Sequence, residues 1–158
     1  MSYSKKHLLE TKEIVEKLDE SEIEYLVSAI KQIKINKGRL FFLGVGGSAG
    51  NCSHAVNDFR KIIGIESYAP TDNVSELTAR TNDEGWDTVF VEWLKISQLS
   101  KKDAIFVFSV GGGSVEKNIS TNLVSAINYA KEIKSKIFSI VGKSDGYAAN
   151  NSNNCIIV

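Results

Sequence analysis

Hydrophobic positions in the first 38 residues recur at the spacing of a helix. Apolar residues on one side of Leu8–Leu18 predict a first helix there. A second helix is predicted to begin at Ser21, because this hydroxyl can cap it and Glu24 completes a capping box. Lys37-Gly38 is a typical helix end. The apolar positions of the second helix are Ile23, Leu26, Val27, Ile30 and Ile33.

From residue 39 the pattern changes to short apolar runs that alternate with helical stretches. Continuous apolar runs are typical of strands buried on both faces, so an α/β fold is predicted, with a doubly wound, mainly parallel five-stranded sheet flanked by helices. The predicted strands are 39–43, 65–69, 104–109, 136–141 and 155–158. The predicted helices are 48–62, 74–81, 87–98 and 122–133, with a short turn near 147–149.

The chain of 158 residues is interpreted as a single domain. It comprises an N-terminal helical pair over 1–38 and an α/β core over 39–158. The sequence ends on the apolar run Ile156-Ile157-Val158, which is typical of a core strand. Since a core strand needs a helix to cover it, a C-terminal helix is expected to be missing.

Charge and composition exclude several classes of partner. The formal net charge is zero and no basic run stands out, so neither nucleic acid nor an anionic membrane surface is expected as a partner. No apolar stretch approaches membrane-spanning length, and the first residues lack the apolar region of a secretory signal. The two cysteines, Cys52 and Cys155, match no metal or redox spacing. We expect a cytoplasmic protein with reduced thiols.

Two loops rich in glycine and serine carry the candidate chemistry. Gly44–Ser48 follows the first core strand, and Ser109–Ser114 follows the third. Glycine lets backbone N–H groups turn toward a ligand, a helix N-terminus adds partial positive charge, and serine adds hydroxyl donors, so both loops suit a phosphate. The carboxyl ends of parallel strands meet at one edge of the sheet, which places the loops together. Neither loop has the lysine or the glycine spacing of nucleotide-binding motifs, which favours a sugar phosphate.

A simpler interpretation exists for each part of these loops. A tight strand-to-helix turn also needs glycine, and any one of Ser48, Ser109 and Ser114 could serve only as a helix N-cap. Taken together on two converging loops, they favour phosphate binding.

Four segments of the chain then resemble a known family. They are Gly44–Asp58, Ser75–Gly85, Ser109–Ser114 and Ile140–Gly146. With these the chain resembles the SIS (sugar isomerase) fold and, within it, the phosphoheptose isomerases. The resemblance implies a homotetramer with active sites at subunit contacts, often containing zinc. It also implies interconversion of sedoheptulose 7-phosphate and glycero-manno-heptose 7-phosphate, toward heptose for lipopolysaccharide or capsule.

The same resemblance assigns roles to individual residues. It makes His54 a metal ligand and Asp58 both a ligand and the catalytic base. It places substrate contacts at three sites along the chain: Val45, Gly46, Gly47 and Ser48; Asn82 and Asp83; and Ser109, Val110, Gly111 and Ser114.

The chain departs from the family pattern at several of these positions. Val45 replaces an asparagine that contacts the sugar, and Asp58 is one methylene shorter than the usual glutamate. The loop Ser109–Ser114 lacks two side-chain donors and is followed by an apparent insertion, Val115–Thr121. The family's C-terminal helix, which supplies a glutamine and a catalytic histidine, has no counterpart before Val158.

Spacing alone leaves the role of His54 and Asp58 open. Residues four apart share one face of a helix, which fits half of a zinc site and equally fits a plain surface pair. Zinc needs three or four ligands, while His7 belongs to no matching motif and Cys52 faces away from His54. The zinc expectation therefore rests on the resemblance. The alternative to an isomerase is a non-catalytic SIS module that binds a phosphosugar and regulates or scaffolds a partner.

Overall fold

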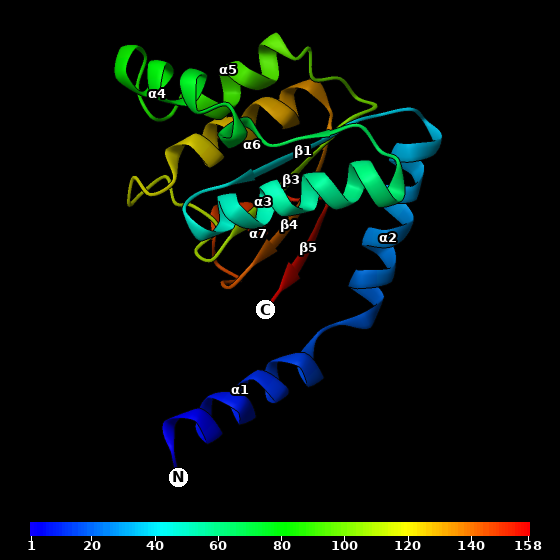
Figure 1. Cartoon of the computed structure of the whole chain (residues 1–158), viewed down its shortest axis with the longest axis vertical. Helices are drawn as coiled ribbons and strands as arrows, with labels where there is room; N and C mark the ends of the chain where they lie inside the picture. Colours follow the sequence, from blue (N-terminus) through cyan, green and yellow to red (C-terminus); the bar gives the residue numbers. More distant parts are fainter.

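The computed structural model describes every residue from Met1 to Val158. Its centre is one sheet of five parallel strands in the order β2-β1-β3-β4-β5. Figure 1 labels β1, β3, β4 and β5 of this sheet. The order reverses between β1 and β3, so the predicted doubly wound parallel sheet is confirmed. The strands are β1 (Leu40–Gly44), β2 (Ser67–Tyr68), β3 (Ala104–Ser109), β4 (Lys136–Val141) and β5 (Asn154–Ile157).

Seven α-helices connect and flank these strands. They are α1 (Tyr3–Lys17), α2 (Glu20–Ile35), α3 (Gly47–Asp58), α4 (Val74–Asp83), α5 (Val89–Ile96), α6 (Thr121–Ile133) and α7 (Tyr147–Asn151). A 3₁₀ turn, Pro70–Asp72, precedes α4. The predicted helix 48–62 is in fact α3 followed by a π-helical turn, Phe59–Ile63, which ends at Gly64 in the left-handed conformation.

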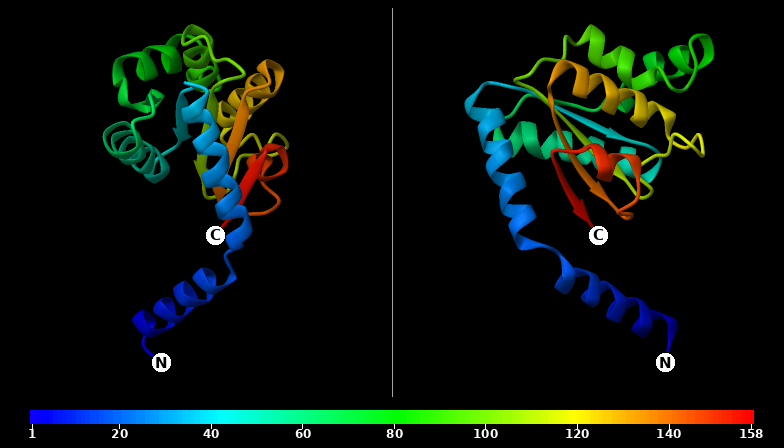
Figure 2. Two further views of the ribbon diagram at one scale, coloured as in Figure 1. Left: turned by 90° about the vertical axis from the view of Figure 1, so that its right-hand side faces the viewer. Right: turned by 180° about the vertical axis from the view of Figure 1, so that it is seen from behind.

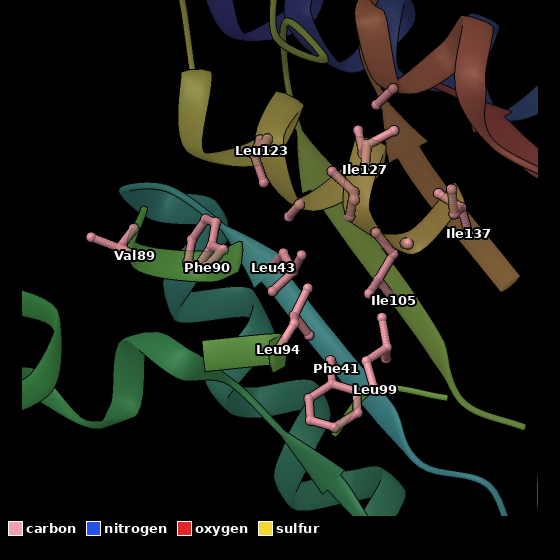
Figure 3. Close-up of a cluster of buried hydrophobic side chains, with 14 of the residues drawn as sticks. Phe41, Leu43, Val89, Phe90, Leu94, Leu99, Ile105, Leu123, Ile127 and Ile137 are labelled. Carbon is pink, nitrogen blue, oxygen red and sulfur yellow. The ribbon is translucent and has the colours of Figure 1, made fainter. Parts of the chain in front are cut away.

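The alternating side chains of the strands build one core on each face of the sheet. Phe41 and Ile105 point to the face covered by α5, α6 and α7. Figure 3 shows this core, where Leu43 and Ile105 of the strands meet Phe90 of α5 and Ile127 of α6. Phe42 and Phe106 point to the opposite face, where α2 and α3 pack. Burial on both faces explains why these strands are continuously apolar in sequence.

The N-terminal pair differs from its prediction at the start of the second helix. Asp19, not Ser21, caps α2, because its carboxylate accepts the backbone N–H groups of Ser21 and Glu22. A carboxylate reaches these amides as well as a hydroxyl and also favours the positive end of the helix dipole. Ser21 instead donates its hydroxyl to Asp19.

Helix α1 extends away from the rest of the molecule (Figures 1 and 2). None of its residues is buried, and apolar side chains including Leu8, Leu9 and Val15 face solvent. The apolar surface of α1 therefore has no partner inside this chain. A helix of 15 residues is marginally stable on its own in water, so we expect α1 to need such a partner. Neither α1 nor any other helix is long and apolar enough to span a membrane.

Candidate functional site

A cavity of about 500 Å³ opens at the carboxyl ends of the strands. Ser48 of α3 and Ser109 of β3 both line it, so the structure brings the two glycine–serine loops together as predicted. The position is the one where doubly wound sheets bind ligands, beside the reversal of strand order between β1 and β3. The other lining residues are Asn51, Phe108, Val110, Ile140, Val141, Gly142 and Val158.

The turn from β1 into α3 leaves backbone donors free beside this cavity. Gly46 is the N-cap of α3, with φ 62° and ψ −124°, a conformation that favours glycine. None of the hydrogen bonds of the chain uses the backbone N–H groups of Val45, Gly46 or Gly47. No side chain caps the helix either. The turn therefore offers unpaired N–H groups at the positive end of a helix, which suits an anion.

The glycines of the two loops are present for different physical reasons. A Cβ at Gly44 would lie 2.8 Å from the backbone of Ser48 and 2.9 Å from Cys52 Sγ, so glycine lets α3 pack closely against β1. A Cβ at Gly47 or Gly111 would meet no atom within 4 Å, and neither residue has a positive φ. Packing therefore explains Gly44 but not Gly47 or Gly111, and those two leave the backbone open to a ligand.

The three candidate serines are not helix N-caps. Gly46 caps α3, and Ser120 is the N-cap residue of α6, without a side-chain hydrogen bond. Ser109 Oγ accepts the N–H of Gly112 at 3.0 Å, within its own loop. The N-capping interpretation is therefore wrong for these serines, while Ser48 and Ser109 remain at the cavity.

Ser114, the third serine of the site expected from the sequence, is not among the residues that line this cavity. Its backbone pairs with Ile119 in an antiparallel bridge, and its hydroxyl accepts the N–H of Lys117 at 3.2 Å. The preceding Gly112 and Gly113 turn the chain in left-handed conformations and accept N–H groups from Ala148 and Tyr147. The insertion after Ser114 therefore forms its own turn, which pairs with the backbone of Ser114 and uses its hydroxyl.

His54 and Asp58 form a pair on α3, with His54 Nε2 3.2 Å from Asp58 Oδ2. Their side chains are 78% and 40% exposed, and neither lines the cavity. The sequence predicted that both share one face of a helix, and the resemblance made both of them site residues. Ten residues of helix put Asp58 about 15 Å beyond Ser48 and about 80° around the axis, so the pair lies along the same helix, outside the cavity.

The residues of this chain do not fit a zinc site. No group of three or more histidine, cysteine, aspartate and glutamate side chains lies close enough to hold a metal ion. Cys52 is buried against β1 on the other side of α3 from His54, and burial raises the pKa of its thiol to about 12. Since zinc needs at least three protein ligands, His54 and Asp58 alone do not satisfy it.

The remaining predicted contacts lie in different places. Val110 lines the cavity and is well exposed, whereas Val45 is exposed but does not line it. Asn82 and Asp83 form the exposed last turn of α4, where Asn82 Nδ2 donates to Asp83 Oδ1 at 2.7 Å. The cavity includes neither of these two residues.

Asn51 lines the cavity but was not singled out from the sequence. It lies three residues after Ser48, and residues at this spacing share one face of a helix. This spacing from Ser48 is the sequence signal that could have identified Asn51.

Comparison with known proteins extends this picture. A family model described as SIS domain matches residues 3–142. The phosphoheptose isomerase of Helicobacter pylori is 29% identical, over 98% of this chain and 81% of that protein. The solved phosphoheptose isomerase of Neisseria gonorrhoeae superposes with a TM-score of 0.81 at 21% identity, covering 98% of this chain and 84% of the other.

A solved structure of another class shares the fold less closely. The sugar isomerase domain of an RpiR transcription factor from Sphaerobacter thermophilus has a TM-score of 0.65 at 17% identity. It covers 92% of this chain and 67% of the other. The resemblance to phosphoheptose isomerases stated from the sequence is therefore confirmed. The fold also occurs in a protein that is named as a transcription factor.

Proposed function

Because the chain belongs to the SIS domain family, we propose that it is a phosphosugar aldose–ketose isomerase whose substrate is sedoheptulose 7-phosphate. The product is glycero-manno-heptose 7-phosphate, for the synthesis of heptose for lipopolysaccharide or capsule. The observation that carries the proposal is the cavity lined by both Ser48 and Ser109, with the free amides of the turn into α3 directly before Ser48 in the chain. Free backbone N–H groups at the positive end of a helix suit the phosphate of a sugar phosphate.

The relatives favour an enzyme over a non-catalytic binder. A curated relative that matches nearly the whole chain is an isomerase by name, and the similarity of fold is greater to a phosphoheptose isomerase than to the RpiR domain. The His54–Asp58 pair adds a carboxylate of the kind that a proton transfer needs. A binding module requires no such group.

The proposed chemistry moves a hydrogen between neighbouring carbons. The carboxylate of Asp58 takes the proton from C1, and the C1–H electrons form the double bond of an enediolate, with the negative charge on O2. Transfer of the O1 proton to O2 and return of the abstracted proton to C2 give the aldehyde at C1 and a hydroxyl group at C2. His54 Nε2, 3.2 Å from the carboxylate, holds Asp58 in position. The seven-carbon chain puts phosphate and reacting carbons at opposite ends, so a substrate anchored at the start of α3 extends along this helix.

Removing the two cavity hydroxyls is expected to weaken binding of sedoheptulose 7-phosphate. We expect the double variant Ser48→Ala/Ser109→Ala to raise Kd by about tenfold to a hundredfold, because hydrogen bonds to a charged group are lost. Isothermal titration calorimetry measures this. Ser28→Ala, an exposed serine of α2, is the matched control. An affinity unchanged in the double variant would place the phosphate elsewhere.

We further propose that the protein is a homotetramer. The exposed apolar side chains of α1 need a partner surface, and α1 has none within this chain. Light scattering at micromolar concentration is expected to give four times the mass of one chain. Replacing Leu8 and Val15 by serine should lower that mass, since both side chains lie in solvent in the single chain. A monomer from the unmodified protein would reject the proposal.

A further inference from the structure

The cavity contains one polar side chain to which neither the fold nor the resemblance gives a role. Only three of its lining residues have polar side chains, namely Ser48, Asn51 and Ser109, and none has a charged one. Ser109 Oγ already accepts an N–H from Gly112. The side chain of Asn51 makes no hydrogen bond in the chain and is exposed. Its amide is therefore fully available to a ligand.

The chemistry of an amide differs from that of its neighbours in the cavity. Asparagine offers two donors and an acceptor in one plane, and neither group changes charge with pH. A sugar hydroxyl both donates and accepts, so an amide can satisfy one hydroxyl fully or two adjacent hydroxyls at once. A carboxylate at this position could only accept and would repel a phosphate.

The position of Asn51 on α3 suits the middle of a long substrate. Asn51 lies about 4.5 Å along the helix axis from Ser48, and about 10 Å before Asp58, given a rise of about 1.5 Å per residue. Asn51 and Asp58 are seven residues apart, so they lie on nearly the same stripe of the helix. A sugar phosphate whose phosphate is held at Ser48 and whose reacting carbons lie at Asp58 must pass Asn51.

We propose that Asn51 binds the hydroxyl groups in the middle of the sugar chain and so selects polyhydroxylated phosphates. The inference rests on the proposed function, since it takes Ser48 as the phosphate end and Asp58 as the reacting end. Asn51 recognises the sugar, whereas the start of α3 recognises the phosphate. A change at Asn51 therefore affects sugar phosphate and inorganic phosphate differently.

The test compares the two probes in Asn51→Ala and Asn51→Asp. Calorimetry with sedoheptulose 7-phosphate should show Kd raised by about tenfold or more in Asn51→Ala, the loss expected for one or two hydrogen bonds. The Kd for inorganic phosphate should change less than twofold. Asn51→Asp should weaken binding of both probes, because it adds a negative charge. Gln32→Ala removes an exposed amide from the last turn of α2 and is the matched control.

The possible failures are distinguishable. If the unmodified protein binds inorganic phosphate but neither binds nor converts sedoheptulose 7-phosphate, the proposed function fails, and the role of Asn51 fails with it. If the unmodified protein binds and converts the sugar, and Asn51→Ala matches it within twofold, the inference about Asn51 is overturned while the function stands. Equal losses for sugar and inorganic phosphate in Asn51→Ala would assign Asn51 to the phosphate end and would likewise overturn the inference.

Discussion

Replacing Asp58 by asparagine is expected to lower turnover of sedoheptulose 7-phosphate by about a hundredfold to ten-thousandfold, the usual contribution of a general base. Asparagine keeps the shape of the side chain but cannot take a proton at C1. Binding should persist, because the phosphate is held about 15 Å away at the first turn of α3. Steady-state kinetics with calorimetry separates the two effects: kcat falls while Kd stays nearly constant.

Two further variants test whether Asp58 acts as a base. Glu132→Gln makes the same change of carboxylate to amide on the exposed surface of α6 and should leave kcat unchanged. His54→Ala removes the group that holds the carboxylate and should lower kcat less than Asp58→Asn does. Near-normal turnover by Asp58→Asn would show that the base lies elsewhere.

The sheet could be predicted from sequence because its physical signal is local. Leu40–Leu43 and Ala104–Val107 are continuously apolar since each strand is covered on both faces, and this burial selects the residue types directly. The edge strand Ser67–Tyr68 is shorter than the predicted 65–69, because it pairs with β1 alone and over only two residues. The cap of α2 was misplaced by two residues, since Asp19 and Ser21 are both good capping residues.

The site was harder to predict because its geometry depends on loop paths and helix rotation. No residue pattern in Val115–Ile119 predicts that this segment folds back and pairs with Ser114. Spacing placed His54 and Asp58 on one face of α3 correctly, but the direction of that face depends on how α3 sits on β1. The close approach at Gly44 fixes that packing.

A second large effect is expected at Asp103, far from the cavity, at the start of β3. Its side chain is buried, and its carboxylate accepts hydrogen bonds from the backbone and guanidinium of Arg39 and from the backbone and hydroxyl of Ser100. These bonds join the starts of β1 and β3. Asp103→Ala is expected to lower the free energy of unfolding by about 3–5 kcal/mol, because Arg39 and Ser100 lose a buried, charged partner. Urea unfolding at pH 7 measures this.

The same contacts predict how the loss depends on pH. Burial alone would raise the pKa of the Asp103 carboxyl group, but the hydrogen bonds from Arg39 and Ser100 outweigh burial and hold the pKa below its ordinary value. A carboxyl group with a lowered pKa in the folded state stabilises above its unfolded pKa of about 3.9 and loses that contribution as the pH falls through the folded value. The difference between the unmodified protein and Asp103→Ala should therefore be constant from pH 7 to 5 and shrink below about pH 4.

Asp145→Ala is the control for this pH dependence, because the Asp145 side chain is exposed in a loop and makes no hydrogen bond. Its effect should stay within about 0.5 kcal/mol at every pH. Asp103→Asn should fall between the unmodified protein and Asp103→Ala at pH 7, since an amide retains part of the hydrogen bonding without the charge. A difference between Asp103→Ala and the unmodified protein that is equally large at pH 3 and pH 7 would mean that packing, not the ionised carboxylate, stabilises this junction of β1 and β3.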